Sequence, residues 1–248
     1  MIGEAGITSR VARRGGALPQ AAVPMAGAVL QRRATVGGAQ PGHDAMARPQ
    51  PVTQVIRFRR EQDIYRPGES GGYSYGVLDG MVRSVAVMRD GRRQVGAFFL
   101  KGDRFGFDTG ERQDYGAEAV IDCTLVRYPR CGVDSLADGD PAFAVALCGI
   151  VRRQLREARA HLLSLGRGTA KERVAAFLLA MRSRMGDDGR TLALPMPRGD
   201  IADHLGLTVE TVSRVLNGLH RQGIISLETP HRVVVADASS LSAIAEMR

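Results

Sequence analysis

Residues 197–224, PRGDIADHLGLTVETVSRVLNGLHRQGI, contain two short helical patterns with a glycine between them. In the second pattern apolar residues recur at the spacing of one helix face, and they are Val212, Val215, Leu216 and Leu219. Polar residues repeat the same spacing on the opposite face: Glu210, Ser213, Arg214 and Asn217. A helix that packs by one face and presents such side chains on the other can read base edges in the major groove of DNA.

The residues around this helix predict a winged helix-turn-helix. Ile201 and Leu205 form the apolar face of a first helix, and Gly206 makes the turn. Thr208 can cap the second helix by accepting a hydrogen bond from a backbone N–H of its first turn. Residues 224–236 then read as strand, turn and strand, which is the pattern of a two-stranded wing.

The polar side chains of the second helix have defined hydrogen-bonding capacities. Arg214 can donate two parallel hydrogen bonds to guanine, Glu210 can accept one from cytosine, and Ser213 can bond a base or lie against a thymine methyl group. Three further residues are candidate phosphate contacts: Arg198, Thr208 and Thr211. The alternative for Glu210 and Arg214 is an ordinary surface ion pair, worth about 0.2–0.5 kcal/mol.

Residues 52–130 predict short strands separated by glycine turns. Runs such as YSYGVL and MVRSVAVM favour β-structure, and RQVGAFFL continues the pattern. Asp79-Gly80 and Asp90-Gly91 are hairpin signals between these runs. Many short strands with tight turns indicate an antiparallel barrel or sandwich.

A long amphipathic helix is predicted over residues 139–166, with Pro141 in its first turn. Its apolar stripe includes Phe143, Leu147, Val151, Leu155 and Leu162. One interpretation is a helix that pairs with its twin across a two-fold axis, and we favour it because half-sites on DNA call for a symmetric dimer. The alternative is a single helix packed across the β-domain.

A second helix follows, and the chain divides into four predicted parts. Thr169 and Glu172 have the spacing of a capping box, so a helix begins there and continues through Met185. The predicted parts are a disordered tail at 1–51, a β-domain at 52–138, a dimerisation helix at 139–166 and a winged helix-turn-helix at 167–248. This is an α+β chain.

Charge alone does not identify the partner of the chain. The net charge is +8, but residues 191–248 carry five basic and six acidic side chains, so the predicted reading domain is not the basic part. Three cysteines without a CxxC spacing favour a reducing compartment, and we expect the cytoplasm. No apolar run is long enough to span a membrane.

The order of these segments resembles the CRP/FNR superfamily of bacterial transcription regulators. The run LGLTVETVSR (205–214) is similar to the recognition helix of its FixK branch, with the spacing E-x-x-S-R. RQVGAFFLKGDRFGF (93–107) is similar to the family's F-x-x-G-D-x-F-G segment, and DTGERQDYGAEA (108–119) is most similar to the FixK branch. The resemblance covers residues 52–236 and implies an N-terminal β-roll, or jelly roll, of the cyclic-nucleotide-binding type.

The resemblance also implies a target and partners. Glu210, Ser213 and Arg214 would read a TTGAT-like half-site, and a second subunit would read the inverted copy in TTGAT-N4-ATCAA. Two half-sites one helical turn apart, about 34 Å, fit a two-fold dimer. We expect a transcription activator of low-oxygen respiration or nitrogen-fixation genes, with RNA polymerase as a partner and Arg89–Arg93 as a candidate contact.

Departures from the family pattern exclude several effectors. Residues 106–119 contain no Arg followed by Ser or Thr, the pair that holds the cyclic phosphate in cAMP-binding members, so we expect no cAMP. No cysteine precedes Cys123, so the ligands of an iron–sulfur cluster are missing, and Cys123 is expected to be a core residue. We expect no cofactor and no metal.

Two alternatives to an effector-free DNA-binding regulator remain. The first is a ligand-sensing regulator with haem, for which His161 or a methionine is a candidate ligand, or with an unknown small effector in the β-roll. The second is an enzyme on the same barrel, but none of the five histidines lies within residues 52–130 and no catalytic triad or phosphate loop is visible. We therefore expect no enzymatic activity.

Overall fold

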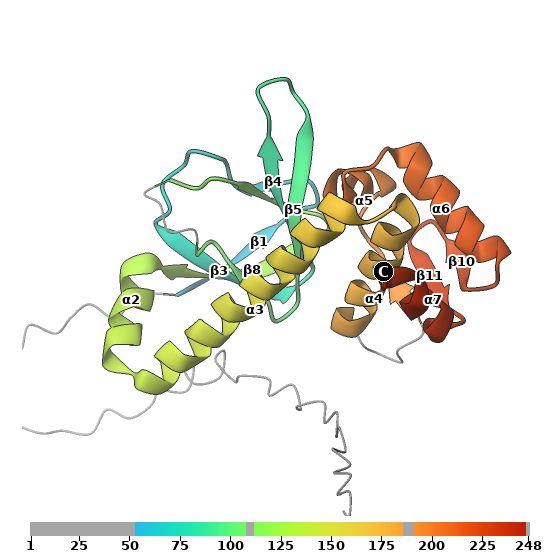
Figure 1. Cartoon of the computed structure of the whole chain (residues 1–248). Coiled ribbons are helices and arrows are strands. Elements are labelled where there is room, and N and C mark those ends of the chain that lie inside the picture. Colours follow the sequence, from blue (N-terminus) through green and yellow to red (C-terminus); the bar gives the residue numbers. More distant parts are fainter. Residues whose placement is uncertain (1–52, 108–111, 186–190, 247–248) are drawn as a thin grey trace, which may run out of the picture. The chain divides into compact units, whose positions relative to one another are not determined.

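The computed structural model describes residues 53–107, 112–185 and 191–246 (Figure 1). The predicted tail at 1–51 and the turn predicted at 187–189 lie outside these residues. The order of the described elements is a set of β-strands, a long helix, and a group of short helices with a small sheet. This order confirms the predicted α+β fold, while the exact domain boundaries stay predictions.

Two four-stranded antiparallel sheets form the described part of the β-roll. One sheet has the order β1-β8-β3-β6 and the other the order β2-β7-β4-β5. The strands are β1 (Gln54–Phe58), β2 (Asp63–Tyr65), β3 (Tyr73–Asp79), β4 (Met81–Val87), β5 (Arg93–Leu100), β6 (Arg104–Phe105), β7 (Gly116–Ala119) and β8 (Cys123–Pro129). The sequence predicted the longer strands and missed β2 and β6.

The turn between β3 and β4 shows why a glycine stands there. Gly80 has a φ of 90°, in the region that side chains avoid. A Cβ at this position would lie 2.5 Å from the carbonyl oxygen of Asp122, so the backbone of the neighbouring turn leaves no room for one. Gly91 has a φ of 83° in the β4–β5 turn, which confirms the second hairpin signal.

The sheet that contains β4 and β5 has two buried faces. One face lines the interior of the β-roll with residues such as Val82, Ala117 and Ala119. The other face carries Met81 and Val95 and, together with Phe98 and Leu100, belongs to the same apolar core as the helices that follow. The helix-turn-helix and this sheet therefore share one continuous core.

Three helices connect the β-roll to the helix-turn-helix: α2 (Arg130–Gly139), α3 (Pro141–Arg167) and α4 (Ala170–Met185). The side chain of Asp140 caps α3, and it accepts hydrogen bonds from two backbone N–H groups in the first turn. The capping box predicted at the start of α4 is confirmed. The N–H of Thr169 donates to the Glu172 carboxylate at 2.8 Å, and the N–H of Glu172 donates to the Thr169 hydroxyl at 3.3 Å.

The C-terminal elements form a winged helix-turn-helix. They are β9 (Thr191–Ala193), α5 (Arg198–Leu205), α6 (Val209–Arg221), β10 (Ile225–Thr229), β11 (Arg232–Val235) and α7 (Ala238–Ala245). The small sheet has the order β10-β11-β9, so the wing hairpin is joined by the strand that precedes α5. Between α5 and α6, Gly206 adopts the left-handed conformation with φ 61°.

Candidate nucleic-acid interface

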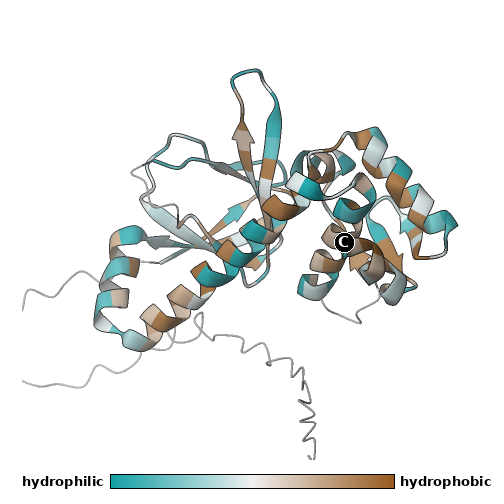
Figure 2. Cartoon of the chain, in the orientation of Figure 1, coloured by the Kyte–Doolittle hydropathy of each residue, from teal (hydrophilic) through white to brown (hydrophobic). Residues whose placement is uncertain are grey.

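Helix α6 is set by its cap and by its apolar face. The Thr208 hydroxyl accepts a hydrogen bond from the N–H of Thr211, so the helix begins at the predicted residue. Val212, Leu216 and Leu219 are buried against the core of the domain. Figure 2 shows the polar residues in teal along the rest of this helix. The packing fixes which side of α6 remains open to a ligand.

The outward side of α6 carries the predicted base-reading residues. Glu210 and Arg214 are exposed and Ser213 is half-buried. Within the described residues, Arg214 makes no hydrogen bond and no ion pair, so its guanidinium is free to donate. A backbone hydrogen bond, the Thr208 hydroxyl and the charge of Arg214 hold the pKa of Glu210 below its usual value. The carboxylate is therefore charged and ready to accept hydrogen bonds.

The three predicted phosphate contacts differ in their surroundings. Thr208 is exposed and Thr211 is half-buried at the N-terminus of α6, and their hydroxyl oxygens lie 3.0 Å apart. Arg198 is half-buried at the start of α5, and its Nη1 is buried without a hydrogen-bond partner. Burial lowers the pKa of this guanidinium. The two threonines are thus well placed at a helix N-terminus, and any phosphate contact of Arg198 would use its other nitrogens.

Helix α3 leaves an apolar stripe uncovered. No described residue of its 27 is buried. Among the predicted interface residues, Val151, Leu155 and Leu162 are exposed by 45, 49 and 69%, while Phe143 and Leu147 are half-buried. Val145 and Leu163 are also exposed. The helix touches the β-roll through polar contacts, such as the Gln154 amide to the carbonyl of Arg104 at 2.6 Å, and the stripe remains open.

Aromatic rings fill the interior of the β-roll. Tyr65 stacks on Tyr75, Tyr75 on Phe105 and Phe105 on Phe99, with ring centroids 5.6, 5.3 and 4.8 Å apart. Cys123 is buried in the same cluster, and this burial raises the pKa of its thiol to about 11. A neutral, buried thiol is a poor metal ligand. The described residues contain no group of histidine, cysteine or acidic side chains suited to a metal ion.

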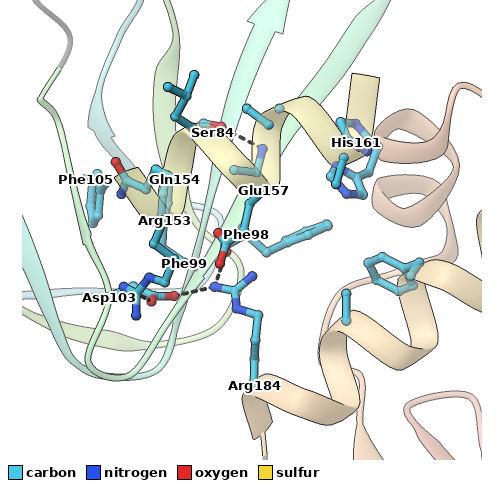
Figure 3. A pocket seen from close by; sticks show the side chains of 18 of the residues that line it. Ser84, Phe98, Phe99, Asp103, Phe105, Arg153, Gln154, Glu157, His161 and Arg184 are labelled. Atoms are coloured by element: carbon cyan, nitrogen blue, oxygen red, sulfur yellow. Dashed lines mark hydrogen bonds and ion pairs between the residues drawn. The ribbon is translucent and has the colours of Figure 1, made fainter. Parts of the chain in front are cut away.

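A cavity of about 760 Å³ lies between β5 and the helices α3 and α4. Phe98, Phe99 and His161 line it, and Arg184 pairs with Asp103 at its edge (Figure 3). The His161 ring stacks on the ring of His204 with centroids 4.0 Å apart, and its Nε2 is buried without a partner. The cavity is the one feature of the described residues that favours a small effector.

The fold and the exposed face of α6 define a DNA-binding protein of the winged helix-turn-helix class, joined to a β-roll of the cyclic-nucleotide-binding type. Two family models agree with this division: the cyclic nucleotide-binding domain matches residues 55–140, and the Crp-like helix-turn-helix domain matches residues 172–244. The chain belongs to the CRP/FNR family of transcription regulators.

Relatives and solved structures support the same assignment. The chain is 44% identical over 206 residues to the nitrogen fixation regulation protein FixK of Azorhizobium caulinodans, covering 80% of this chain and 83% of that protein. It is 39% identical over 187 residues to FixK of Rhizobium meliloti, covering 75% of this chain and 85% of that protein. The structure of FixK2 from Bradyrhizobium japonicum matches with a TM-score of 0.76 at 41% identity, covering 79% of this chain and 99% of that one.

The names of these two relatives describe them as regulation proteins. None of the described helices is both long enough and apolar enough to cross a membrane.

Proposed function

We propose that this protein is a homodimeric transcription activator of FixK type that reads a TTGAT-N4-ATCAA-like palindrome without cAMP or an iron–sulfur cluster. One observation carries the proposal. Helix α6 buries Val212, Leu216 and Leu219, which leaves Glu210 and the unpaired Arg214 on the outward face. The alternative role of these two residues, a mutual surface ion pair, is limited to the effect of the Arg214 charge on the Glu210 carboxylate, because their charged groups form no direct salt bridge in the described residues.

The two copies of the chain pair along α3 in this proposal. A 27-residue helix with Val151, Leu155 and Leu162 exposed on one stripe would leave apolar area in water in a monomer. Covering the stripe with the same stripe of a second copy gives a two-fold axis, and a two-fold axis supplies two reading helices for an inverted repeat.

The proposed absence of cAMP and of a cluster follows from residue chemistry. Residues 106–119 lack the Arg-Ser/Thr pair that would neutralise a cyclic phosphate. The stacked rings of Tyr65, Tyr75 and Phe105 occupy the interior of the β-roll. Cys123, the first cysteine of the chain, is buried with a raised thiol pKa. The activity of such a regulator would follow its amount in the cell.

The second candidate is a regulator that senses a small effector. The cavity beside Phe98 and His161 supports it, because the unpartnered Nε2 of His161 offers a haem iron or a polar ligand one nitrogen. DNA binding by the purified protein, measured alone and with added cAMP, haem or iron, separates the two candidates. Binding without any addition supports the effector-free regulator, and a strict requirement for one addition supports the sensor.

The partners follow from this function. The protein would act in the cytoplasm, where its DNA target lies, and an activator would touch RNA polymerase. Arg89 and Arg92 stand exposed at the tip of the β4–β5 hairpin and are the proposed polymerase contact. Footprinting on a fragment that carries TTGAT-N4-ATCAA tests the core of the proposal. Protection of both half-sites by the unliganded protein is expected, and protection equal to that of a scrambled fragment would contradict it.

A further inference from the structure

A charged cluster joins the β-roll to the first helix of the helix-turn-helix. On the β-roll side, Arg83 of β4 and Arg93 of β5 supply two guanidinium groups. On the α5 side, Asp200 accepts from Nη1 of Arg83 at 2.6 Å and also pairs with Arg93, and Asp203 accepts from Nε of Arg93 at 2.8 Å. Asp200 thus bridges both arginines, and we call this set of four residues the α5 latch.

The ion pair between Arg83 and Asp200 in the α5 latch is buried. The side chains of Arg83 and Asp200 are only 4 and 1% exposed. Within the β-roll, Arg83 also donates hydrogen bonds from Nη2 to Glu118 and Glu61, each at 2.6 Å. Contacts within the β-roll therefore fix its guanidinium independently of α5. A buried charge without its partner is strongly unfavourable, so the buried Asp200 carboxylate of α5 requires the two arginines of the β-roll.

Further contacts fix α5 on β5. The Nδ1 of His204 lies 3.0 Å from the carbonyl oxygen of Val95, and the Gln94 amide donates to the carbonyl of His204 at 3.3 Å. The ring of His204 packs edge-on against Phe98, with centroids 5.3 Å apart. Polar and apolar contacts therefore hold the same helix on the same sheet.

The chain connection alone cannot orient the reading helix. Between α3 and α4 only Gly168 and Thr169 intervene, and one short link permits rotation of the domain that follows. Arg173 strengthens the link, because it donates to the carbonyls of Gly168, Leu165 and Leu205 at 2.8–3.0 Å. The α5 latch and the contacts of His204 with β5 together add a second, distant attachment point, and two attachment points fix an orientation that one does not.

We propose that Asp200, through Arg83 and Arg93, is a positioning residue that sets the direction of α6 relative to the α3 dimer axis and thereby the half-site spacing that the dimer accepts. The inference rests on the proposed dimer and palindrome. Asp200 does not touch DNA in this account. It acts through α5, which shares the apolar core with α6.

Two matched variants test the latch in the full-length protein. Asp200→Asn neutralises a carboxylate that binds Arg83 from α5, while Glu118→Gln neutralises one that binds the same guanidinium from within the β-roll. Binding is measured to TTGAT-N4-ATCAA and to the same half-sites with a five-base spacer. The wild type is expected to prefer the four-base spacer. In Asp200→Asn this preference should fall about tenfold, a typical coupling between distant sites, and Glu118→Gln should keep it.

The outcomes separate positioning from simple stabilisation. A merely structural role would weaken binding to both spacers equally and leave their ratio unchanged, which would overturn the proposal. If Asp200→Asn does not fold, Arg93→Gln gives the same test, because Arg93 is 32% exposed and binds both aspartates of α5. A ratio unchanged in that folded variant would also overturn it.

If the wild type does not bind the palindrome specifically, the proposed function is contradicted, but the α5 latch can still be tested by a measurement without DNA. Backbone hydrogen exchange is then compared over α5 and over β5. The latch predicts faster exchange of both segments in Asp200→Asn than in Glu118→Gln, because only the first variant frees one segment from the other. Equal exchange in the two variants would overturn the latch.

Discussion

At the scale of single residues, the surroundings of each arginine decide its role. Arg83 is buried among carboxylates, and their hydrogen bonds raise its pKa above the usual value despite its desolvation. Arg214 is exposed and has no partner in the described residues. Arg83 therefore has a structural role, and Arg214 is available to a ligand that presents paired acceptors, as guanine does.

Replacing Arg214 by Ala is expected to cost about 1–3 kcal/mol of binding to the specific site and to relax the preference for guanine, since a bidentate contact is lost. The measurement is the affinity for the palindrome and for versions with the guanine replaced. Arg221→Ala, at the exposed end of the same helix, is the matched control and should leave the base preference intact. An equal loss on specific and scrambled DNA would make Arg214 a phosphate contact.

The three cysteines should differ in reactivity. Cys131 and Cys148 are exposed, while Cys123 is buried and its thiol pKa is raised to about 11. Because the thiolate is the reactive form, a thiol reagent at pH 8 is expected to label Cys131 and Cys148 before Cys123. Cys123 should react only after unfolding in denaturant. Rapid labelling of Cys123 in the native protein would contradict its assignment to the core.

The histidine pair predicts a pH dependence of stability. Burial, the neighbouring His161 of α3 and the charge of Arg184 of α4 lower the pKa of His204 to about 4. The unfolded chain binds a proton on this histidine below about pH 6.5, whereas the folded chain does not until about pH 4. His204 therefore does not reduce the free energy of unfolding above pH 6.5, and this free energy falls as the pH drops from 6.5 to 4.

Thermal unfolding between pH 4 and 7 checks this expectation. In His204→Phe the fall in Tm over that range should be smaller, and the remainder reflects His161, whose pKa is also lowered by burial. If His204→Phe has the same dependence of Tm on pH as the wild type, other groups control the loss of stability at low pH.

At the scale of elements, periodic segments were predictable and short or weakly periodic ones were not. The stripes of α3 and α6 and the alternating strands β4 and β5 are visible in the sequence. Helix α2 was missed, because Gly132 and Gly139 each lower helix propensity by about 1 kcal/mol relative to alanine. Strands β2 and β6, of three and two residues, are too short to show a period.

Helix α7 was also missed, although the sequence carried a signal for it. The carboxylate of Asp237 accepts hydrogen bonds from the N–H groups of Ser239 and Ser240 and so caps the helix. An aspartate before the alanine-rich run ASSLSAIA is such a capping pattern.

The apolar stripe of α3 makes its own prediction. Leu155→Glu should convert the dimer to monomers at micromolar concentration, because the pairing would bury two carboxylates in an apolar interface. Sedimentation measures the mass of the particle. Val55→Glu is the control, since Val55 is 64% exposed on the edge strand β1 and not on α3, and should leave the dimer unchanged. A dimeric Leu155→Glu protein would place the interface elsewhere.

At the scale of the whole molecule, the ion pairs of the α5 latch could not be predicted from the sequence. Arg83 and Asp200 lie 117 positions apart, and no local pattern relates them. One signal existed, because Arg83 stands between Met81 and Val85 on the same face of a predicted strand, where a charge needs a partner. The sequence shows that need, but only the fold identifies the carboxylate that meets it.

The reading of DNA by two α6 helices related by one two-fold axis is tested most directly by hydroxyl-radical footprinting of the full-length protein on a TTGAT-N4-ATCAA fragment, without any added effector. Two equal protected regions centred about 34 Å apart are expected, and both should be lost when the guanine of both half-sites is replaced. Protection that is absent, confined to one half-site, or indifferent to the guanine would contradict it.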